Sequence, residues 1–126
     1  MKNIMLNIFV VVFFIGTASG QIQQGPSKKL DSVSLKVISF LKSKQPDSVY
    51  ALTGKAFREK ITSENFNSIT TNQIFPLTDF QNVKYVSTSQ GINKYRIEGS
   101  PVLQLLIGLD VDDKIQTLLI QEYTGD

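Results

Sequence analysis

The chain shows two hydrophobic periods, a helical one before residue 78 and a strand-like one after residue 82. Near the start, apolar residues recur at steps of three and four, which predicts a helix from Ser27 to Ser43 with one buried stripe. The stripe consists of Leu30, Val33, Val37, Phe40 and Leu41. The lysines dispersed around it are expected to form a solvated face rather than a ligand site: Lys28, Lys29, Lys36, Lys42 and Lys44.

Two more helices are expected before the period changes. Pro46 suits a first helical turn, and a short helix should run from there to Gly54, a residue typical of helix ends. Another should begin at Thr62 or Ser63 and end at Pro76, because the residue before a proline is pushed out of helical geometry. Its stripe would be Phe66, Ile69, Gln73, Ile74 and Leu77, and between the two helices Phe57 and Ile61 continue an apolar edge.

From residue 82 onward, the pattern predicts four strands, at 83–87, 92–98, 102–109 and 114–123. Tyr95 and Ile97 alternate with Lys94 and Arg96, so this strand should have one buried and one polar face. The run at 102–109 is nearly all apolar and is expected to be central and covered on both faces. Short turns between the strands make an antiparallel meander. The predicted class is α+β, with three N-terminal helices packed on a four-stranded sheet.

The first twenty residues have the pattern of a cleavable signal peptide. Lys2 precedes an apolar run from Ile4 to Ile15, and the small residues Ala18-Ser19-Gly20 occupy the sites that a signal peptidase reads. As a helix, the apolar run would reach roughly 18 Å, short of the ~30 Å core of a bilayer. We therefore expect cleavage after Gly20, a periplasmic or secreted product with no membrane span, a flexible lead-in at 21–29 and one domain at 30–126.

Composition excludes several classes of function. With Lys2 removed, 12 basic residues face 11 acidic ones, so nothing favours binding to nucleic acid or to an anionic membrane. The chain has no cysteine, which removes thiol chemistry and a lipoprotein anchor. It has no histidine either, which removes the commonest general base, the commonest metal ligand and every Ser-His-Asp arrangement.

Several strings resemble those of a small exported bacterial domain of the nuclear-transport-factor-two-like (cystatin-like) superfamily. The similarity spans residues 30–124, and the strings that carry it are KQPDSVYAL at 44–52, Phe57-Arg58, TSENF at 62–66, FPL at 75–77, GINKY at 91–95, LQLLIGLD at 103–110 and Lys114-Ile115. The resemblance implies a cystatin-like cone that often dimerises through its sheet. In relatives, the domain often lies between a signal peptide and a serine hydrolase domain of the β-lactamase or penicillin-binding type, and alone it is usually a domain of unknown function.

Two departures from the family pattern matter. This chain stops at Asp126, where a fused hydrolase would begin, so no hydrolase activity is carried over. Asp113 stands in the last turn where glycine is usual, and Asp tolerates the left-handed geometry that such a turn needs.

Three short sequence strings resemble catalytic, phosphate-binding or calcium-binding motifs, but the residues around them do not complete the motif. Ser39 and Lys42 match an S-x-x-K spacing, but the residues between them belong to the apolar stripe and no S-D-N or K-T-G follows. The Thr53-Gly54-Lys55 string lacks the upstream glycine of a phosphate loop and is interpreted as a helix stop. Asp110, Asp112 and Asp113 could suggest a calcium-binding loop that begins at Asp110. Such a loop needs Gly at its sixth position and Glu at its twelfth, but these positions hold Ile115 and Gln121. We therefore assign no catalytic, cofactor-binding or metal-binding residue.

Three functions stay open. The first is a non-catalytic binding or accessory module for a protein, an envelope component or a small apolar ligand, with homodimerisation through the sheet. The second is an isomerase or dehydratase whose acid, Glu98 or Glu122 or another, lies in an apolar pocket that raises its pKa. A tyrosine hydroxyl would assist it, from Tyr50, Tyr85, Tyr95 or Tyr123. The third is an accessory part of a serine hydrolase system.

Overall fold

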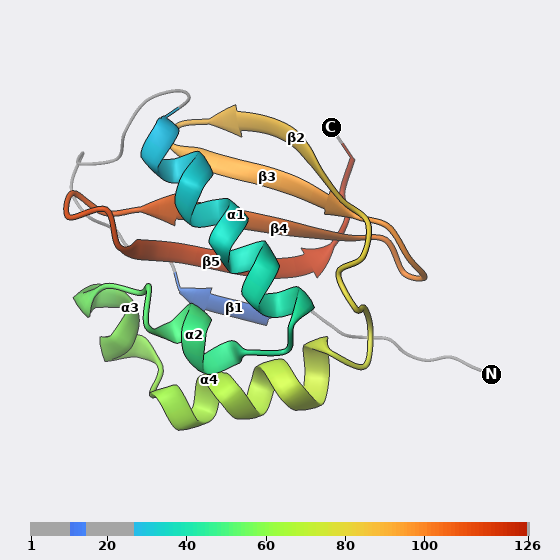
Figure 1. Cartoon of the computed structure of the whole chain (residues 1–126), viewed down its shortest axis with the longest axis horizontal. Helices are drawn as coiled ribbons and strands as arrows, with labels where there is room; N and C mark the ends of the chain where they lie inside the picture. Colours follow the sequence, from blue (N-terminus) through green and yellow to red (C-terminus); the bar gives the residue numbers. More distant parts are fainter. Residues whose placement is uncertain (1–10, 15–26, 126) are drawn as a thin grey trace.

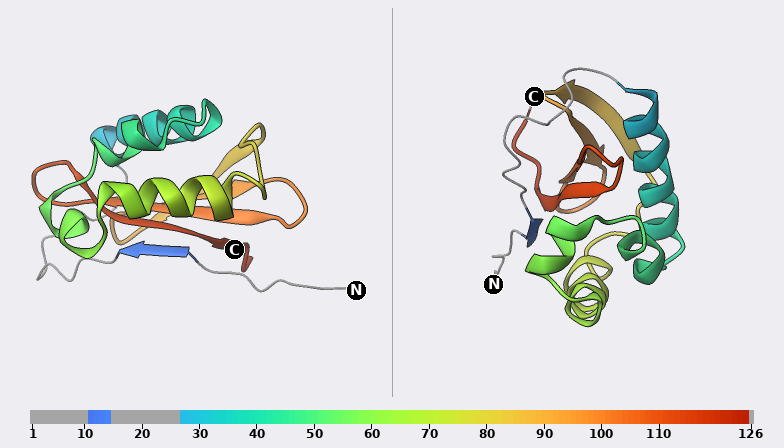
Figure 2. Two further views of the ribbon diagram at one scale, coloured as in Figure 1. Left: turned by 90° about the horizontal axis from the view of Figure 1, so that it is seen from below. Right: turned by 90° about the vertical axis from the view of Figure 1, so that its left-hand side faces the viewer.

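The computed structural model describes residues 11–14 and 27–125. Its strands form one antiparallel sheet in the order β1-β5-β4-β3-β2, and the helices lie on one side of that sheet (Figure 1 and Figure 2). The strands are β1 (Val11–Phe14), β2 (Val83–Ser89), β3 (Ile92–Ile97), β4 (Leu103–Leu109) and β5 (Ile115–Glu122). The helices are α1 (Lys28–Lys42), α2 (Pro46–Tyr50), α3 (Lys55–Lys60), α4 (Ser63–Ile69) and the π-helix η1 (Thr70–Ile74). The predicted α+β class, with helices before a four-stranded meander, is confirmed.

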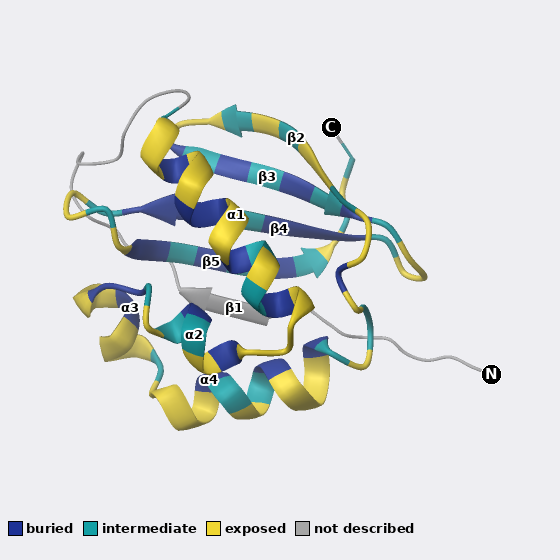
Figure 3. Cartoon of the chain, in the orientation of Figure 1, coloured by how far each residue is buried: buried dark blue, intermediate teal, exposed yellow. Residues whose placement is uncertain are grey.

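The helix α1 forms as its pattern predicts. The Ser27 side chain accepts a hydrogen bond from the Leu30 backbone N–H at 3.2 Å, which satisfies one of the free donors at the helix start. Leu30, Val33, Val37 and Leu41 are buried against the sheet, and the predicted lysine face is exposed (Figure 3).

The helical layer differs from the three predicted helices in one region. The structure has a separate helix, α3, where only an apolar edge was expected, and Gly54 lies at its N-cap rather than simply ending α2. The backbone N–H of Gly54 donates to the Ile115 carbonyl at 2.9 Å, and the Ile115 N–H donates to the Leu52 carbonyl. This parallel bridge between Thr53 and Ile115 ties the helical layer to the start of β5.

The space between helices and sheet is filled with side chains. Phe57, Phe66 and Phe80 are completely buried, and the rings of Tyr50, Phe57 and Phe66 lie 5.6–6.3 Å apart. Six of the seven residues of β4 are buried, as expected for a central strand. Such close packing is typical of a protein interior and leaves the functional groups to be sought at the margins of the core.

The strand β1 was not expected, because its residues belong to the apolar run assigned to the signal peptide. It pairs antiparallel with β5, Val11 opposite Ile120 and Val12 opposite Leu119. The remainder of the predicted signal peptide, including the expected cleavage site at Gly20, lies outside the described residues, as does most of the predicted lead-in at 21–29.

Candidate functional site

A network of polar side chains joins the start of α1 to the β2–β3 hairpin. Alternation along β3 turns Asn93, Tyr95 and Ile97 toward α1, and all three are buried. Asn93 has no exposed surface, and its Nδ2 lies 2.9 Å from Asp31 Oδ1, 3.4 Å from Ser34 Oγ and 3.3 Å from the Tyr95 hydroxyl. We call this set, together with Thr88 and Tyr85, the Asn93 network.

The network ends in a chain of hydroxyl groups. Thr88 Oγ1 donates to Asn93 Oδ1 at 2.5 Å, so the Tyr85 hydroxyl, 2.6 Å from the same Thr88 oxygen, acts as the donor in that pair. The Tyr85 and Tyr95 rings pack edge to face at 5.8 Å. Asn93 therefore has partners for both its amide nitrogen and its amide oxygen, which is what a fully buried amide requires.

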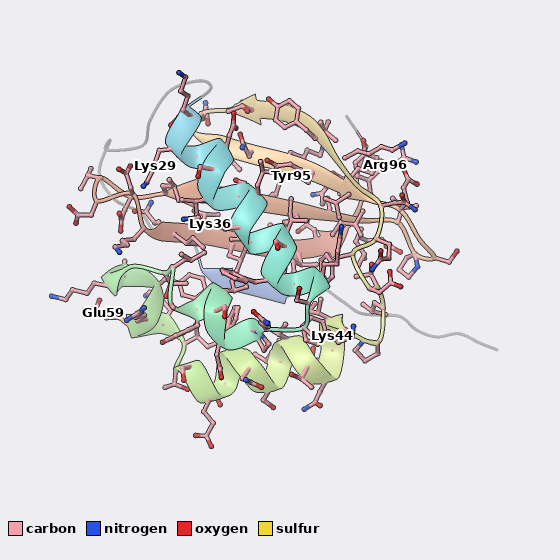
Figure 4. The ribbon with its side chains drawn as sticks, viewed as in Figure 1. Lys29, Lys36, Lys44, Glu59, Tyr95 and Arg96 are labelled. Atoms are coloured by element: carbon pink, nitrogen blue, oxygen red, sulfur yellow. The ribbon has the colours of Figure 1, made fainter. Side chains whose placement is uncertain are left out.

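Tyr95 is the titratable group that this environment perturbs. Burial raises the pKa of Tyr95 above the ordinary value of 10.0, the hydrogen bonds with Ser34 and Asn93 lower it in part, and the Asp31 charge raises it further. The phenol is thus held neutral, as a hydrogen-bonding group at the sheet side of α1 (Figure 4). Asp31 itself lies at an exposed position on the first turn of α1.

The other cluster lies on the outer face of the sheet, the face opposite the helices. Register places Lys84 of β2 directly opposite Arg96 of β3, and Lys94 lies on the same face two residues before Arg96. Like charges directly opposite each other destabilise a strand pair. By itself this pairing of cations is therefore unfavourable, and the Glu98 carboxylate, 3.1 Å from Arg96 Nε, offsets part of the repulsion.

The C-terminal segment crosses this outer face. Lys94 Nζ and the Arg96 guanidinium each lie 5.1 Å from the centre of the Tyr123 ring, a distance at which a cation interacts with an aromatic face. Lys94 Nζ also donates to the Gly125 carbonyl. Both the N–H and the hydroxyl of Thr124 donate to the Gln104 side-chain oxygen, at 3.1 and 3.2 Å. We call the four residues Lys84, Lys94, Arg96 and Tyr123 the outer-face platform.

The acids suggested by sequence do not lie in the core. Glu98 Oε2 lies 3.1 Å from Arg96 Nε in a half-exposed ion pair, and Glu122 is exposed at the end of β5. The Tyr50 hydroxyl donates to the Ile61 carbonyl at 2.8 Å. Asp31 is an acid that the structure links to the Tyr95 hydroxyl, through Asn93.

The residues of the three motif-like strings rejected from the sequence lie on the surface or support local structure. Ser39 and Lys42 are both exposed on α1. Thr53 is buried, donates its hydroxyl to the Tyr50 carbonyl and accepts from Arg58 Nε at 3.0 Å. Asp110 Oδ1 accepts from the N–H groups of Asp112 and Lys114 at 2.8 and 3.0 Å and thereby organises the last hairpin turn.

The predicted left-handed residue of that turn is confirmed, since Asp113 has φ 62°. Within residues 11–14 and 27–125, no group of three or more acidic, histidine or cysteine side chains is placed to hold a metal ion. Over the same ranges, no helix combines the length and the apolar character that a membrane crossing needs.

The described surface includes two hollows at other places. One of about 470 Å³ lies where the Thr53–Gly54 bridge meets α3, and its lining is Thr53, Gly54, Lys55, Arg58, Glu59 and Lys114. The other, of about 360 Å³, lies between the segment after η1 and the end of β3, and its lining is Phe75, Pro76, Leu77, Thr78, Asp79, Glu98 and Gly99. Neither lining includes a member of the Asn93 network.

Sequence reasoning missed most of the Asn93 network, although two positions carried a signal. Ser34 lies inside the apolar stripe of α1, and Asn93 shares the inward face of β3 with Tyr95 and Ile97. A polar residue at an inward position calls for a hydrogen-bonding partner. The partner Asp31 is 62 residues from Asn93, so the pairing itself was not readable from the pattern.

Comparisons of the chain with protein families, with curated proteins and with solved structures found no match.

Proposed function

We propose that this chain is an exported, non-catalytic binding module that holds a partner protein on the outer face of its sheet. The observation that carries the proposal is the outer-face platform, where three cations and an aromatic ring gather on a face that none of the described helices covers. An anionic partner that neutralises these charges would relieve the repulsion between Lys84 and Arg96.

The chemistry of the platform indicates what the partner presents. Lys94 and Arg96 offer charged donors, Tyr123 offers a ring, and Arg96 carries the planar donor set that binds carboxylates well. The matching surface is an acidic protein segment. Its carboxylates would replace the contacts that Gly125 and Glu98 make with these cations.

The packed interior favours binding over catalysis. An isomerase or dehydratase needs an acid in a cavity, next to the substrate whose proton it moves. In the described structure, large aromatic side chains fill the space between the helices and the sheet, and Asp31 faces solvent. Export follows from the signal-peptide pattern, and a hydrolase reading frame beside this gene would favour an accessory role in such a system.

The test is a titration with an acidic probe peptide, eight glutamates with one tyrosine, followed by ¹⁵N amide shifts of the protein. We expect saturable shifts in β2, β3 and residues 123–125. The double substitution Lys94→Ala/Arg96→Ala should weaken binding roughly tenfold or more, since each lost charge pair removes about 1 kcal/mol.

The matched control is Lys29→Ala/Lys36→Ala, which removes the same charge from exposed positions on α1. It should change the affinity by less than about threefold, because those lysines lie on the helical side of the molecule. Shifts that spread over the whole surface, or an equal loss of affinity in both double variants, would contradict an outer-face site. Melting temperatures of both variants show whether each remains folded.

A further inference from the structure

The two outer strands of the four-stranded meander, β2 and β5, differ in how they are protected against pairing. The edge strand β2 has an exposed lysine, Lys84, and a β-bulge between Tyr85 and Ser87, both of which discourage a further strand. The strand β5 has no lysine, arginine or proline along its eight residues, and its middle is Leu118-Leu119-Ile120. An unprotected apolar strand of this kind is built to be paired.

The structure shows what pairs with it. The short apolar strand β1 lies antiparallel to β5, opposite Leu118, Leu119 and Ile120. The start of β5 is already occupied, because Ile115 bonds to Leu52 and Gly54 through the parallel bridge. The acceptor edge is therefore a short one, beginning after this bridge and ending with β5, and it suits a segment about as long as β1.

The sequence pattern places β1 inside the segment expected to be removed on export. We propose that, in the processed protein, the β5 edge receives an extended apolar segment of a partner protein, which enters antiparallel in the place that β1 occupies here. Main-chain hydrogen bonds give such strand addition its affinity, and the alternating side chains give it its specificity. The bridge at Ile115 favours a short peptide over the full β5 strand of a second copy.

This inference rests on the removal of residues 1–20 and not on the outer-face platform. The buried apolar side chains that fill the space between the helices and the four-stranded meander run from Leu30 to Ile120. We expect the processed protein to keep its helices and its four-stranded meander, because these elements supply those buried side chains.

The experiment starts from the full chain, expressed in a bacterial host that exports it, with the intact mass of the product locating the cleavage point. Cleavage within residues 15–26 frees the edge, and retention of residues 11–14 in the product overturns the proposal. The probe for the processed protein is a peptide of residues 9–16 with two lysines added at each end for solubility. We expect saturable binding, with amide shifts centred on Leu118–Ile120.

Two matched leucines test the site. Leu119 of β5 and Leu106 of β4 are directly opposite each other and are both half-buried. Leu119→Lys gives β5 the protection that Lys84 gives β2 and should weaken peptide binding by about tenfold or more, whereas Leu106→Lys should change it by less than about threefold. A peptide with prolines in place of Val12 and Phe14 should not bind, because proline lacks the donor that strand pairing needs.

Three results would overturn the proposal. One is the absence of binding by the processed protein, and another is equal weakening by the two lysine substitutions. The third is a dimer of the processed protein with β5 shifts at high protein concentration and no peptide, since that outcome assigns the edge to a second copy. The acidic-peptide titration described above is unaffected by any of these results, so the two proposals fail separately.

Discussion

Replacing Asn93 with alanine tests whether the buried network holds α1 on the sheet. The substitution removes the hydrogen bond to the Asp31 carboxylate at 2.9 Å and the one from Thr88 at 2.5 Å. A hydrogen bond to a charged group contributes about 1.5–3 kcal/mol and a neutral one about 1 kcal/mol. The weaker contact with Ser34 is lost as well. We expect Asn93→Ala to lower the free energy of unfolding by about 3 kcal/mol.

The assay is urea unfolding followed by far-ultraviolet circular dichroism. The midpoint should fall while the slope stays unchanged, and the melting temperature should drop by roughly 10–20 °C for a domain of this size. The control is Asn72→Ala on the exposed side of the helical layer, where the side chain donates to Ser68 Oγ at 3.2 Å in contact with water.

The control substitution should cost less than about 0.5 kcal/mol. A loss below about 1 kcal/mol for Asn93→Ala would refute the reasoning. It would mean that water replaces the amide at no cost, and that the network does not fix the position of α1.

Two further predictions concern Tyr95 and Gly54. Burial raises the pKa of Tyr95, so the folded state keeps the phenol proton to a higher pH than the unfolded state does. The resulting stability is fully present below pH 10 and is lost as the pH rises through the folded-state pKa. Tyr95→Phe should therefore flatten the decline in unfolding free energy that urea unfolding measures between pH 9 and 11. A decline of the same steepness in the variant would assign it to other groups. Gly54→Ala would place a methyl group against the Asp110 carboxylate and 3.0 Å from Lys114 Cβ. Since Asp110 is held by two N–H groups, we expect a loss of about 1–3 kcal/mol by thermal melting, and an unchanged melting temperature would show that the turn yields freely.

Periodicity predicted the elements that bury a regular stripe. The helix α1 and the strands β3, β4 and β5 were found because their apolar residues recur at regular positions. The helix α3 was missed because its six residues include one buried anchor, Phe57, and one anchor makes no period. The π-helical turn η1 was not foreseen either, since the predicted stripe continues through it without a break.

The candidate sites were harder to predict from the sequence than the helices and strands, because they depend on contacts between distant segments. The outer face of β3 was predicted from alternation, but the meeting of Lys94 with Gly125 and of Gln104 with Thr124 depends on how the C-terminal segment turns across the sheet. No local pattern fixes that path. The Asn93 network likewise depends on a contact between the first turn of α1 and a strand 62 residues later.

The parallel bridge at Thr53 has a consequence for the order in which the protein folds. Leu52 and Gly54 exchange backbone hydrogen bonds with Ile115, so the helical layer is completed by a residue that is synthesised about sixty residues later. Contacts this far apart in sequence form slowly, because a long loop must close before they bring any gain. The segment between α2 and α3 is therefore synthesised early, but its backbone link to the sheet can form only after β5 has been made.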